Sequence, residues 1–472
     1  MRSGYTYTQG DILVEPYAFI KILDLKIDRK INEHAKIYIS GIISDENADK
    51  YVEVADDDES IKVSVKDDNN NIIDLFQGMV TNIAINSTND VKTLEIEALS
   101  YTFEMDIEKK YRSFQGENLT YADIFNKVNK DYSNLQMREY IPIGQTIDKI
   151  IVQYNETDWE FIKRLASHFN VGVVPECRLS GIKFSIGKGE SEACNLEEFN
   201  YSINKGLKEY KIKSKNSNLG LIDTDLISYQ IVTNKILDLY NSVNFKNRNL
   251  NVYKSETSIV NRVISTKYTL RDEKGMKVRR IYNDKLVGAS LDGKILNTKA
   301  DVVKISLKID GYPGSEENAA WLPYSTVFSS QDGTGWYCMP EIGDAIRMYF
   351  PDNDEKNTYA ISSVNLKASN PAKRSDPSVK SIGTKYGKEI IMKPGAVEVM
   401  ANGSLFMKLT DSGGIEIKSD NKITLDAKKD IEINGENIKI EGKTAVDLVS
   451  GAGATVTINE DVTASGAKIN TQ

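Results

Sequence analysis

The C-terminal part of the chain repeats a short hydrophobic pattern. Pairs of apolar residues spaced two apart recur there, and successive pairs start eight, eight, seven, eight and ten residues apart. The members of these pairs are Ile415, Ile417, Ile423, Leu425, Ile431, Ile433, Ile438, Ile440, Val446, Leu448, Val456 and Ile458. Alternating apolar and polar positions are typical of a strand with one buried face. Since Gly, Asn, Asp and Lys fill the gaps as turn residues, we predict a series of short strands.

Two apolar side chains in each short repeat cannot enclose a core within one chain, because a single-chain β-solenoid needs roughly 20 or more residues for each coil. Cyclic symmetry would let three copies bury their inward rows equally. The pattern therefore predicts a trimeric, triple-stranded β-helix with the paired residues in its core. A disordered tail rich in Lys and Asn is the alternative, but disorder gives no reason for a regular spacing.

Alternation of the same kind fills much of the preceding sequence. It is clear over residues 1–110, where Gly- and Asn-rich breaks separate the apolar runs at the spacing of an antiparallel barrel. A second β-rich region follows at 171–268, with strands expected near 182–186 and at Tyr210–Lys213. The chain is therefore predicted to be mainly β.

Two helices are expected between these β-rich regions. Thr120 and Asp123 have the spacing of a capping box, in which each side chain bonds to the other's backbone N–H at the start of a helix. Thr157 and Glu160 have the same spacing, and apolar residues at helical steps follow both boxes. The predicted helices lie near 120–133 and 157–169.

Composition divides the chain and excludes some functions. A length of 472 residues suggests roughly three domains, and a net charge of −8 gives no basic excess for binding nucleic acid. Of the 40 aromatic residues, only Tyr386 and Phe406 follow position 370, which predicts a change of architecture near 371–380. The odd count of three cysteines, without metal-ligand spacing, predicts free thiols in a reducing cytoplasm.

Candidate catalytic and metal-binding residues are scarce. The two histidines, His34 and His168, are expected at the surface or at a helix end rather than as general bases. The acidic runs at 56–59 and 67–71 suggest calcium, but hairpin tips are expected, since the second run lacks the glycine and closing glutamate of a calcium loop. The start has no signal-peptide core, and no apolar run is long enough to span a membrane. We therefore predict no enzyme activity, cofactor or metal site.

A thirteen-residue run carries a resemblance to a known family. It extends from Gln153 to Leu165 and has the sequence QYNETDWEFIKRL. The run resembles the hub-domain signature of VgrG and of phage late-control tail-hub proteins, in which it leads into a helix between two β-barrels. Farther along, Trp321-Leu322-Pro323 and the run GTGWYCMPEIGD at 333–344 are similar to the small OB-fold domain of the same family.

The resemblance implies an arrangement of parts along the whole chain. It implies a hub of two β-barrels with a helical insertion, then an OB-fold barrel, a linker, and the β-helix as a needle. The boundaries expected for these four parts are 1–280, 281–370, 371–380 and 381–472. It further implies the homotrimeric central spike of a contractile tail, in a phage, a tailocin or an injection system. Such a spike caps the inner tube and pierces the target cell envelope when the sheath contracts.

The resemblance also implies the partners of such a spike. These are further copies of the chain, inner tube and baseplate proteins, the target cell envelope, and a separate PAAR-like tip protein expected to dock near Val462–Ile469. No histidine follows residue 168, so an iron ion held by paired histidines at the tip is not expected. Only a short linker precedes the needle, so a lysozyme domain is not expected either. We expect assembly in the cytoplasm without a signal peptide, and action outside the producing cell or after delivery to a target cell.

Two other functions are alternatives to the spike. A β-helical receptor-binding tail fibre would end in an aromatic-rich head, whereas no aromatic residue follows Phe406. A tail-associated cell-wall hydrolase would need two carboxylates that converge on a glycosidic bond, and a sequence alone does not show which carboxylates converge.

Overall fold

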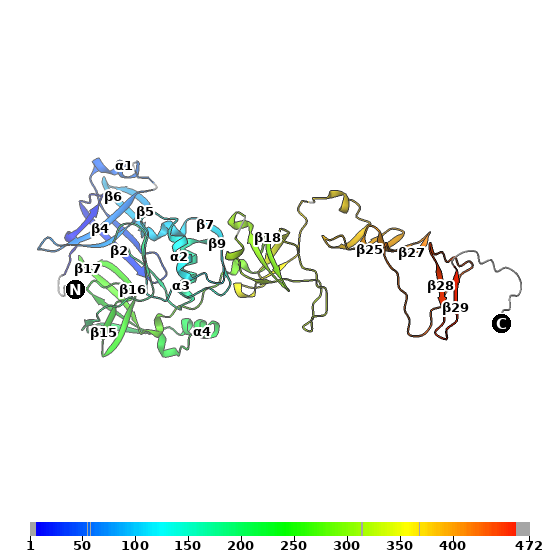
Figure 1. Ribbon diagram of the computed structural model, residues 1–472. Coiled ribbons are helices and arrows are strands. Elements are labelled where there is room, and N and C mark those ends of the chain that lie inside the picture. Colours follow the sequence, from blue (N-terminus) through cyan, green and yellow to red (C-terminus); the bar gives the residue numbers. More distant parts are fainter. Residues whose placement is uncertain (1–5, 54, 57, 313–314, 368, 459–472) are drawn as a thin grey trace. The chain divides into compact units, whose positions relative to one another are not determined.

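A computed structural model describes the chain apart from residues 1–5, 54, 57, 313–314, 368 and 459–472. The chain divides into two units, Met1–Lys367 and Ala368–Gln472, called here the first unit and the second unit. β-Strands are the main regular elements of both units, as predicted, and the helices α1 to α4 all lie in the first unit (Figure 1). The region expected to dock a tip protein, 462–469, lies outside the described residues.

A sheet of twelve strands runs through the first unit, and its strands fall into two groups with the same order of pairing. The first strand group has the order β1-β4-β5-β6-β3-β2, and the second has the order β12-β15-β16-β17-β14-β13. The pairing of β2 with β16 joins the two groups. One difference is that β1 and β4 are antiparallel, whereas β12 and β15 are parallel.

The elements of the first strand group are β1 (Ile12–Glu15), β2 (Lys21–Lys30), β3 (Lys36–Ile42), α1 (Asp45–Glu53), β4 (Ser60–Lys66), β5 (Ile72–Thr88) and β6 (Val91–Leu99). Those of the second are β12 (Cys194–Leu196), β13 (Tyr201–Lys205), α4 (Leu207–Asn216), β14 (Ile227–Thr233), β15 (Ser242–Phe245), β16 (Arg248–Val260) and β17 (Val263–Arg271). The helix α1 was not foreseen in the sequence.

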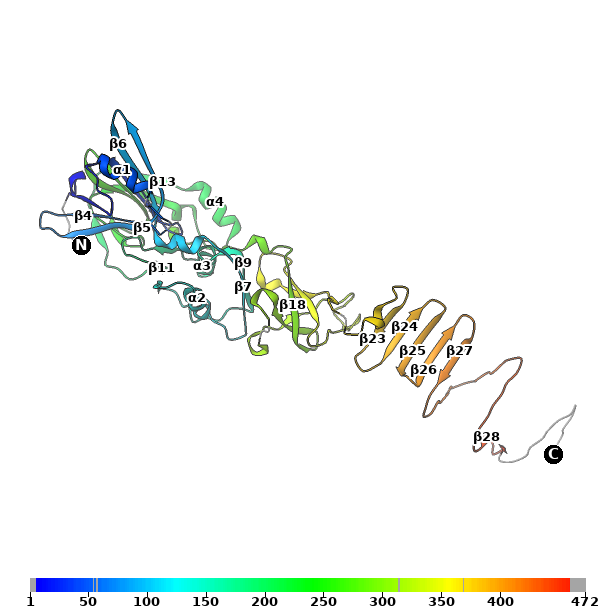
Figure 2. The ribbon, with the colours of Figure 1, turned by 90° about the horizontal axis from the view of Figure 1, so that it is seen from above.

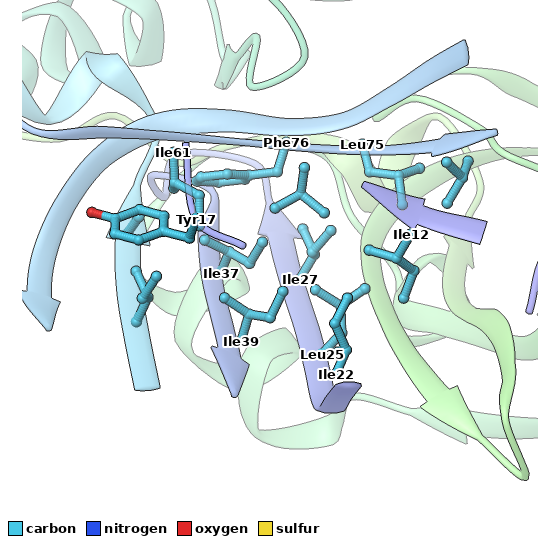
Figure 3. Close-up of a cluster of buried hydrophobic side chains, with 14 of the residues drawn as sticks. Ile12, Tyr17, Ile22, Leu25, Ile27, Ile37, Ile39, Ile61, Leu75 and Phe76 are labelled. Atoms are coloured by element: carbon cyan, nitrogen blue, oxygen red, sulfur yellow. The ribbon is translucent and has the colours of Figure 1, made fainter. Parts of the chain in front are cut away.

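The first strand group surrounds its own apolar core, because its strands alternate between buried and accessible residues. Figure 3 shows side chains from β2, β3, β4 and β5, among them Leu25, Ile39 and Phe76, pointing into one cluster. The sheet curls back on itself, since the backbone N–H of Gln9, just before β1, bonds to the carbonyl of Arg262 beside β17 (2.9 Å). This closes the strands into a nearly complete barrel.

A mixed segment lies between the two strand groups. Its elements are β7 (Lys109–Gln115), α2 (Tyr121–Asn129), β8 (Gln136–Glu139), β9 (Ile150–Thr157), α3 (Asp158–Ser167), β10 (Val173–Pro175) and β11 (Lys183–Ile186). The capping boxes predicted at Thr120 and Thr157 are both present at the starts of α2 and α3. β7 pairs with β9, which leads directly into α3.

Five further strands form a second, smaller barrel in the first unit. They are β18 (Ser290–Lys299), β19 (Val302–Leu307), β20 (Leu322–Pro323), β21 (Ala345–Tyr349) and β22 (Tyr359–Ile361), in the order β20-β19-β18-β21-β22. A parallel bridge between Tyr324 and Ala360 joins the two ends of this sheet. Its core includes Ile305, Met348 and Phe350, all fully buried.

The strand predicted at Tyr210–Lys213 is wrong, because these residues lie in α4. The alternation Tyr-Lys-Ile-Lys imitates a strand. Its neighbours, however, place Glu209 and Lys213 four residues apart, and these two side chains form an ion pair at 2.8 Å. Pairs at this spacing stabilise a helix.

The second unit begins with a meander of five antiparallel strands, which Figure 2 shows side by side. They are β23 (Lys380–Gly383), β24 (Glu389–Lys393), β25 (Ala396–Asn402), β26 (Leu405–Thr410) and β27 (Gly414–Lys418). A hairpin of β28 (Val446–Val449) and β29 (Thr455–Ile458) follows.

The predicted short strands are present at only three of the six apolar pairs, in β27, β28 and β29. Over residues 419–445, all of them described, the chain forms no strand. The pairs at Ile423, Ile431 and Ile438 therefore lie outside strands in the single chain. A strand needs a neighbour for its backbone hydrogen bonds, and one copy of this segment has none within reach.

Candidate functional site

One face of the five-stranded meander in the second unit consists of apolar side chains, apart from Lys380 at its edge. Alternate residues of each strand lie opposite one another across the sheet, in two rows. These nine residues, the apolar face, are Ile382, Ile390, Val399, Met407 and Ile417 in one row, and Met392, Val397, Leu409 and Ile415 in the other. Each of the nine is between 39% and 68% exposed.

The opposite face of the same sheet carries charged side chains together with Ile391, Met400 and Phe406. Glu398 in β25 lies between Lys393 (2.8 Å) and Lys408 (3.5 Å). The hydrogen bond from Lys393 lowers the pKa of the Glu398 carboxyl. A sheet with one polar and one apolar face normally turns the polar face to water and covers the other. The apolar face is therefore a surface without a cover in the single chain.

The structure places the predicted core residues of the needle unevenly. Ile415 and Ile417 belong to the apolar face, whereas Val446 and Leu448 oppose Ile458 and Val456 across the hairpin of β28 and β29. The predicted residues that are 53% to 71% exposed are Ile415, Ile417, Ile423, Leu425, Ile431, Ile433, Ile438, Ile440, Leu448 and Val456. Val446 is half-buried, and the side chain of Ile458 lies outside what the structure describes.

Seven residues of the apolar face were missed in the sequence: Ile382, Ile390, Met392, Val397, Val399, Met407 and Leu409. The same signal was available for most of them. Pairs spaced two apart occur at Ile390/Met392, Val397/Val399 and Met407/Leu409, before the stretch in which the step settles near eight.

The run 153–165 forms a buried polar cluster at the start of α3 in the first unit. Asp158 has no exposed surface. It accepts hydrogen bonds from Gln153 (2.9 Å) and Tyr132 (2.7 Å), and it forms an ion pair with Lys110 (2.8 Å). Arg112 bonds to both Asp158 and Gln153. Burial, with the carboxylate of Asp158 beside it, raises the pKa of Tyr132. The cluster fixes β7, β9 and α3 against one another.

Arg164, in the same run, joins α3 to the smaller barrel. Its buried guanidinium contacts Glu156 at 2.8 Å, Glu355 at 2.7 Å and the carbonyl of Val152 at 2.8 Å. Glu355 precedes β22 and is 4% exposed. Burial raises the pKa of Glu156, although Arg164 acts in the opposite direction. One cation therefore neutralises two buried carboxylates from different parts of the fold.

His34 was predicted at the surface, and the structure shows that this prediction is wrong. Its ring stacks on Trp159, with 4.7 Å between ring centroids, while its nitrogens contact Thr102 (2.8 Å) and Asp106 (3.1 Å). This Thr-His-Asp order resembles that of a hydrolase. Thr102, however, has no exposed surface, so its hydroxyl cannot reach a substrate, and the three residues brace the core beside α3.

His168 lies at the C-terminal end of α3, as predicted. Its Nδ1 is 2.8 Å from the hydroxyl of Tyr121. Burial, together with the nearby Arg280, lowers the pKa of His168 to about 2. The imidazole is therefore neutral in the folded chain near neutral pH.

The cysteines and carboxylates add no further centre among the residues that the structure describes. Cys177, Cys194 and Cys338 are free thiols. No group of three or more His, Cys, Asp or Glu side chains in the described ranges is placed to hold a metal ion. Within these ranges, no helix has the length and apolar character needed to cross a bilayer.

Comparison with known sequences does not establish a family for this chain. The family described as the Alg8 N-terminal domain matches residues 17–201, which is less than half of the chain. The matched span ends at the first residue of β13, within the twelve-stranded sheet, so it does not correspond to a structural unit. Among curated proteins, no sequence matches this chain.

Comparison with solved structures is more informative. The E. coli c3393 protein has a TM-score of 0.53 at 12% identity, over 75% of this chain and 99% of that one. It is described as a type VI secretion component with structural similarity to the T4 bacteriophage tail proteins gp27 and gp5. The chain shares this fold. A chain of the half-lidded Francisella PdpA–VgrG complex gives 0.56 at 10% identity, over 88% of both chains. The lidless complex gives 0.57 at 10% identity, over 84% of this chain and 94% of that one.

Proposed function

We propose that this chain is the homotrimeric hub and central spike of a contractile tail or injection system. In this proposal the first unit caps the inner tube and contacts the baseplate. The second unit is the needle that pierces the target envelope when the sheath contracts. The observation that carries the proposal is the apolar face of the second unit, which continues into the regularly spaced apolar pairs.

Association of three copies would cover the apolar face. Each copy contributes nine aliphatic or Met side chains in two rows, and full burial of such a side chain is worth roughly 1.5–3 kcal/mol. Three identical faces turned toward a common axis bury one another equally. The opposite face, with Glu398, then remains in water. Residues 419–445 would obtain from neighbouring copies the strand partners that they lack within one chain.

The pairing order of the first unit supports the role as a hub. Each chain contains two strand groups of the same order, so a trimer would present six similar groups around its axis. This threefold assembly could then contact a partner ring with sixfold symmetry, such as a tube. The fold shared with the E. coli secretion component agrees with this role.

The smaller barrel supports the proposed OB-fold neck. Its first strand pairs with the second and the fourth, and its third and fifth strands meet in parallel. We propose the boundaries 1–280 for the hub, 281–370 for the neck, 371–380 for the linker and 381–472 for the needle. A PAAR-like protein at the end of the needle belongs to the same proposal.

The proposal is tested by the mass of the full-length protein in solution. Native mass spectrometry at micromolar concentration should give three times the chain mass of 52.8 kDa. The same species should resist SDS at room temperature, since an interlocked β-helix has no free lateral edge. A stable, well-folded monomer at these concentrations would refute the proposal.

A further inference from the structure

The two strand groups of the first unit share their pairing order but carry opposite charge. Residues 12–99, which contain the first group, have 18 Asp and Glu against 9 Lys and Arg. Residues 194–281, which contain the second group and the segment after it, have 16 Lys and Arg against 9 Asp and Glu. Because the folds of the two groups are alike, this difference does not follow from the architecture and calls for another cause.

The positive charge of the second group gathers around a groove beneath α4. The groove has a volume of about 890 Å³, and its lining includes the apolar residues Ile31, Tyr253 and Met276. Lys208 and Arg279 also line this basic groove. No residue of α4 is buried, so the helix leaves the space below it open. The groove therefore combines apolar lining with a cationic rim.

The cations of the basic groove are incompletely neutralised. Arg271 lines the groove, is only 8% exposed, and gives its two terminal nitrogens to Glu209 (3.0 and 2.8 Å), but its Nε has no hydrogen-bond partner. Among the described residues, Lys208, Lys277 and Arg279 form no ion pair with an acidic side chain. A buried donor without an acceptor is costly, so an anionic group would stabilise this site.

The matching acidic surface lies on the first strand group, at α1 and the turn after it. Asp45, Glu46, Glu53, Asp56 and Asp58 are exposed, and none of them is paired with a cation in the described part of the chain. The apolar Val52 on the same helix is 44% exposed. In Figure 1, α1 and α4 lie at opposite edges of the first unit, so these surfaces cannot meet within one chain.

We infer that the basic groove beneath α4 receives the α1 region of a second copy of this chain. Such a contact is heterologous, with different surfaces on its two sides, and it closes into a ring under cyclic symmetry. The hub would then alternate acidic and basic strand groups around its axis. The inference rests on the proposed homotrimer and names the surfaces that bring its hub together.

Zero-length cross-linking of the full-length protein tests this contact. A carbodiimide joins a carboxylate to a lysine amine only where the two touch. In a mixture of ¹⁴N- and ¹⁵N-labelled chains, we expect cross-links from Glu46 or Glu53 to Lys208 or Lys277 that carry both isotopes. Their yield should fall as salt rises, because exposed charges are screened.

Charge reversal supplies the matched controls. Lys208→Glu with Lys277→Glu and Arg279→Glu should lower the yield of α1 cross-links to the remaining amines of the groove about tenfold or more, because like charges would then meet. Adding Glu46→Lys and Glu53→Lys to this triple variant should restore the cross-links. They would then join lysines of the α1 region to glutamates of the groove. Lys211→Glu with Lys215→Glu, on α4 but outside the groove lining, should leave the yield unchanged.

The outcomes separate this inference from the proposed function. A trimer without mixed-isotope links between α1 and the groove overturns the inference and leaves the proposed spike intact, since the needle can hold three chains together. A monomer overturns both. Cross-links that persist unchanged in the triple variant would also overturn the inference.

Discussion

The same alternating strand pattern is buried in one unit of this chain and exposed in the other. In the first unit, alternating strands bury one face against other parts of the chain, so that Leu25 and Phe76 have no exposed surface. In the second unit, strands of equally clear alternation bury nothing: no described side chain between 369 and 456 is buried. Alternation therefore specifies that a face needs a cover, but it does not say which chain provides the cover.

This difference between the two units has a thermodynamic consequence. The first unit carries its own cores, so it should stay folded at every protein concentration, including those at which the chains separate. The ordered structure of the second unit should depend on protein concentration, because association stabilises only the state that binds. The effects of substitutions in the two units should then differ in kind, loss of association against loss of stability, as well as in size.

The largest effect is expected from charges on the apolar face. Ile415→Asp with Ile417→Asp would place six unpaired carboxylates at the axis of a trimer, each costing several kcal/mol when buried. We expect complete loss of the trimer in light scattering, with the first unit still folded by its fluorescence. In a single chain these residues are 68% and 54% exposed, so a protein that functions as a monomer would tolerate the change.

The control for this variant lies on the same strand. Glu416→Asp with Lys418→Asp alters the charged face of β27 and should leave the trimer intact. The same contrast is expected farther along, where Ile431→Asp with Ile433→Asp should abolish the trimer and Lys428→Asp with Lys429→Asp should not. Equal tolerance at both faces would show that the apolar face is not covered by other copies.

In the first unit, the largest effect should come from Arg164. Arg164→Met leaves Glu156 and Glu355 buried without their cation, which should lower the free energy of unfolding by about 3–5 kcal/mol. Urea unfolding followed by tryptophan fluorescence measures this, since all three tryptophans lie in this unit. Lys163→Met, at the half-buried neighbouring position, should cost far less. A loss that varied with protein concentration would contradict the self-sufficiency of the first unit.

Arg164 also shows how far the sequence could predict the fold. The run 153–165 indicated the helix, its capping box and the resemblance, all of which depend on near neighbours. The partner Glu355 lies 191 residues away, and no periodicity links the two positions. The structural roles of Asp158 and His34 were missed for the same reason: their partners come from other strands and loops.

The candidate surface was predictable in part. Ile415 and Ile417 follow from the spacing of the tail, but the face extends back to Ile382, where turns of unequal length break the step of eight. In α4, the alternation at Tyr210–Lys213 imitated a strand, because a short run with lysine at every second position fits either structure. Neither the charge contrast between the strand groups nor the groove beneath α4 can be recognised before the strand order is known.

A smaller effect within the first unit concerns pH. The pKa of His168 is lowered to about 2 in the folded chain, whereas an unfolded histidine has a pKa near 6.5. Below pH 6.5 the unfolded state binds a proton that the folded state does not, so stability falls as the pH falls. Between pH 6.5 and 5, wild-type protein should lose about 2 kcal/mol more than His168→Gln, which keeps an acceptor for Tyr121. If the free energies of unfolding of the wild-type and His168→Gln proteins changed in parallel with pH, folded His168 would take up the proton, contrary to this prediction.

The smallest effect concerns the N-terminal cap of α3, which needs no other chain. The hydroxyl of Thr157 in this cap also donates to Asp106. The side chain of Thr157 caps α3 by accepting from the backbone N–H of Glu160 at 3.1 Å. Thr157→Ala should lower the free energy of unfolding of the first unit by about 1 kcal/mol. Thr157→Ser keeps the hydroxyl and should recover most of the loss. Because both changes act within one chain, their effects on urea unfolding should be the same in the wild-type background and in the Ile415→Asp, Ile417→Asp background.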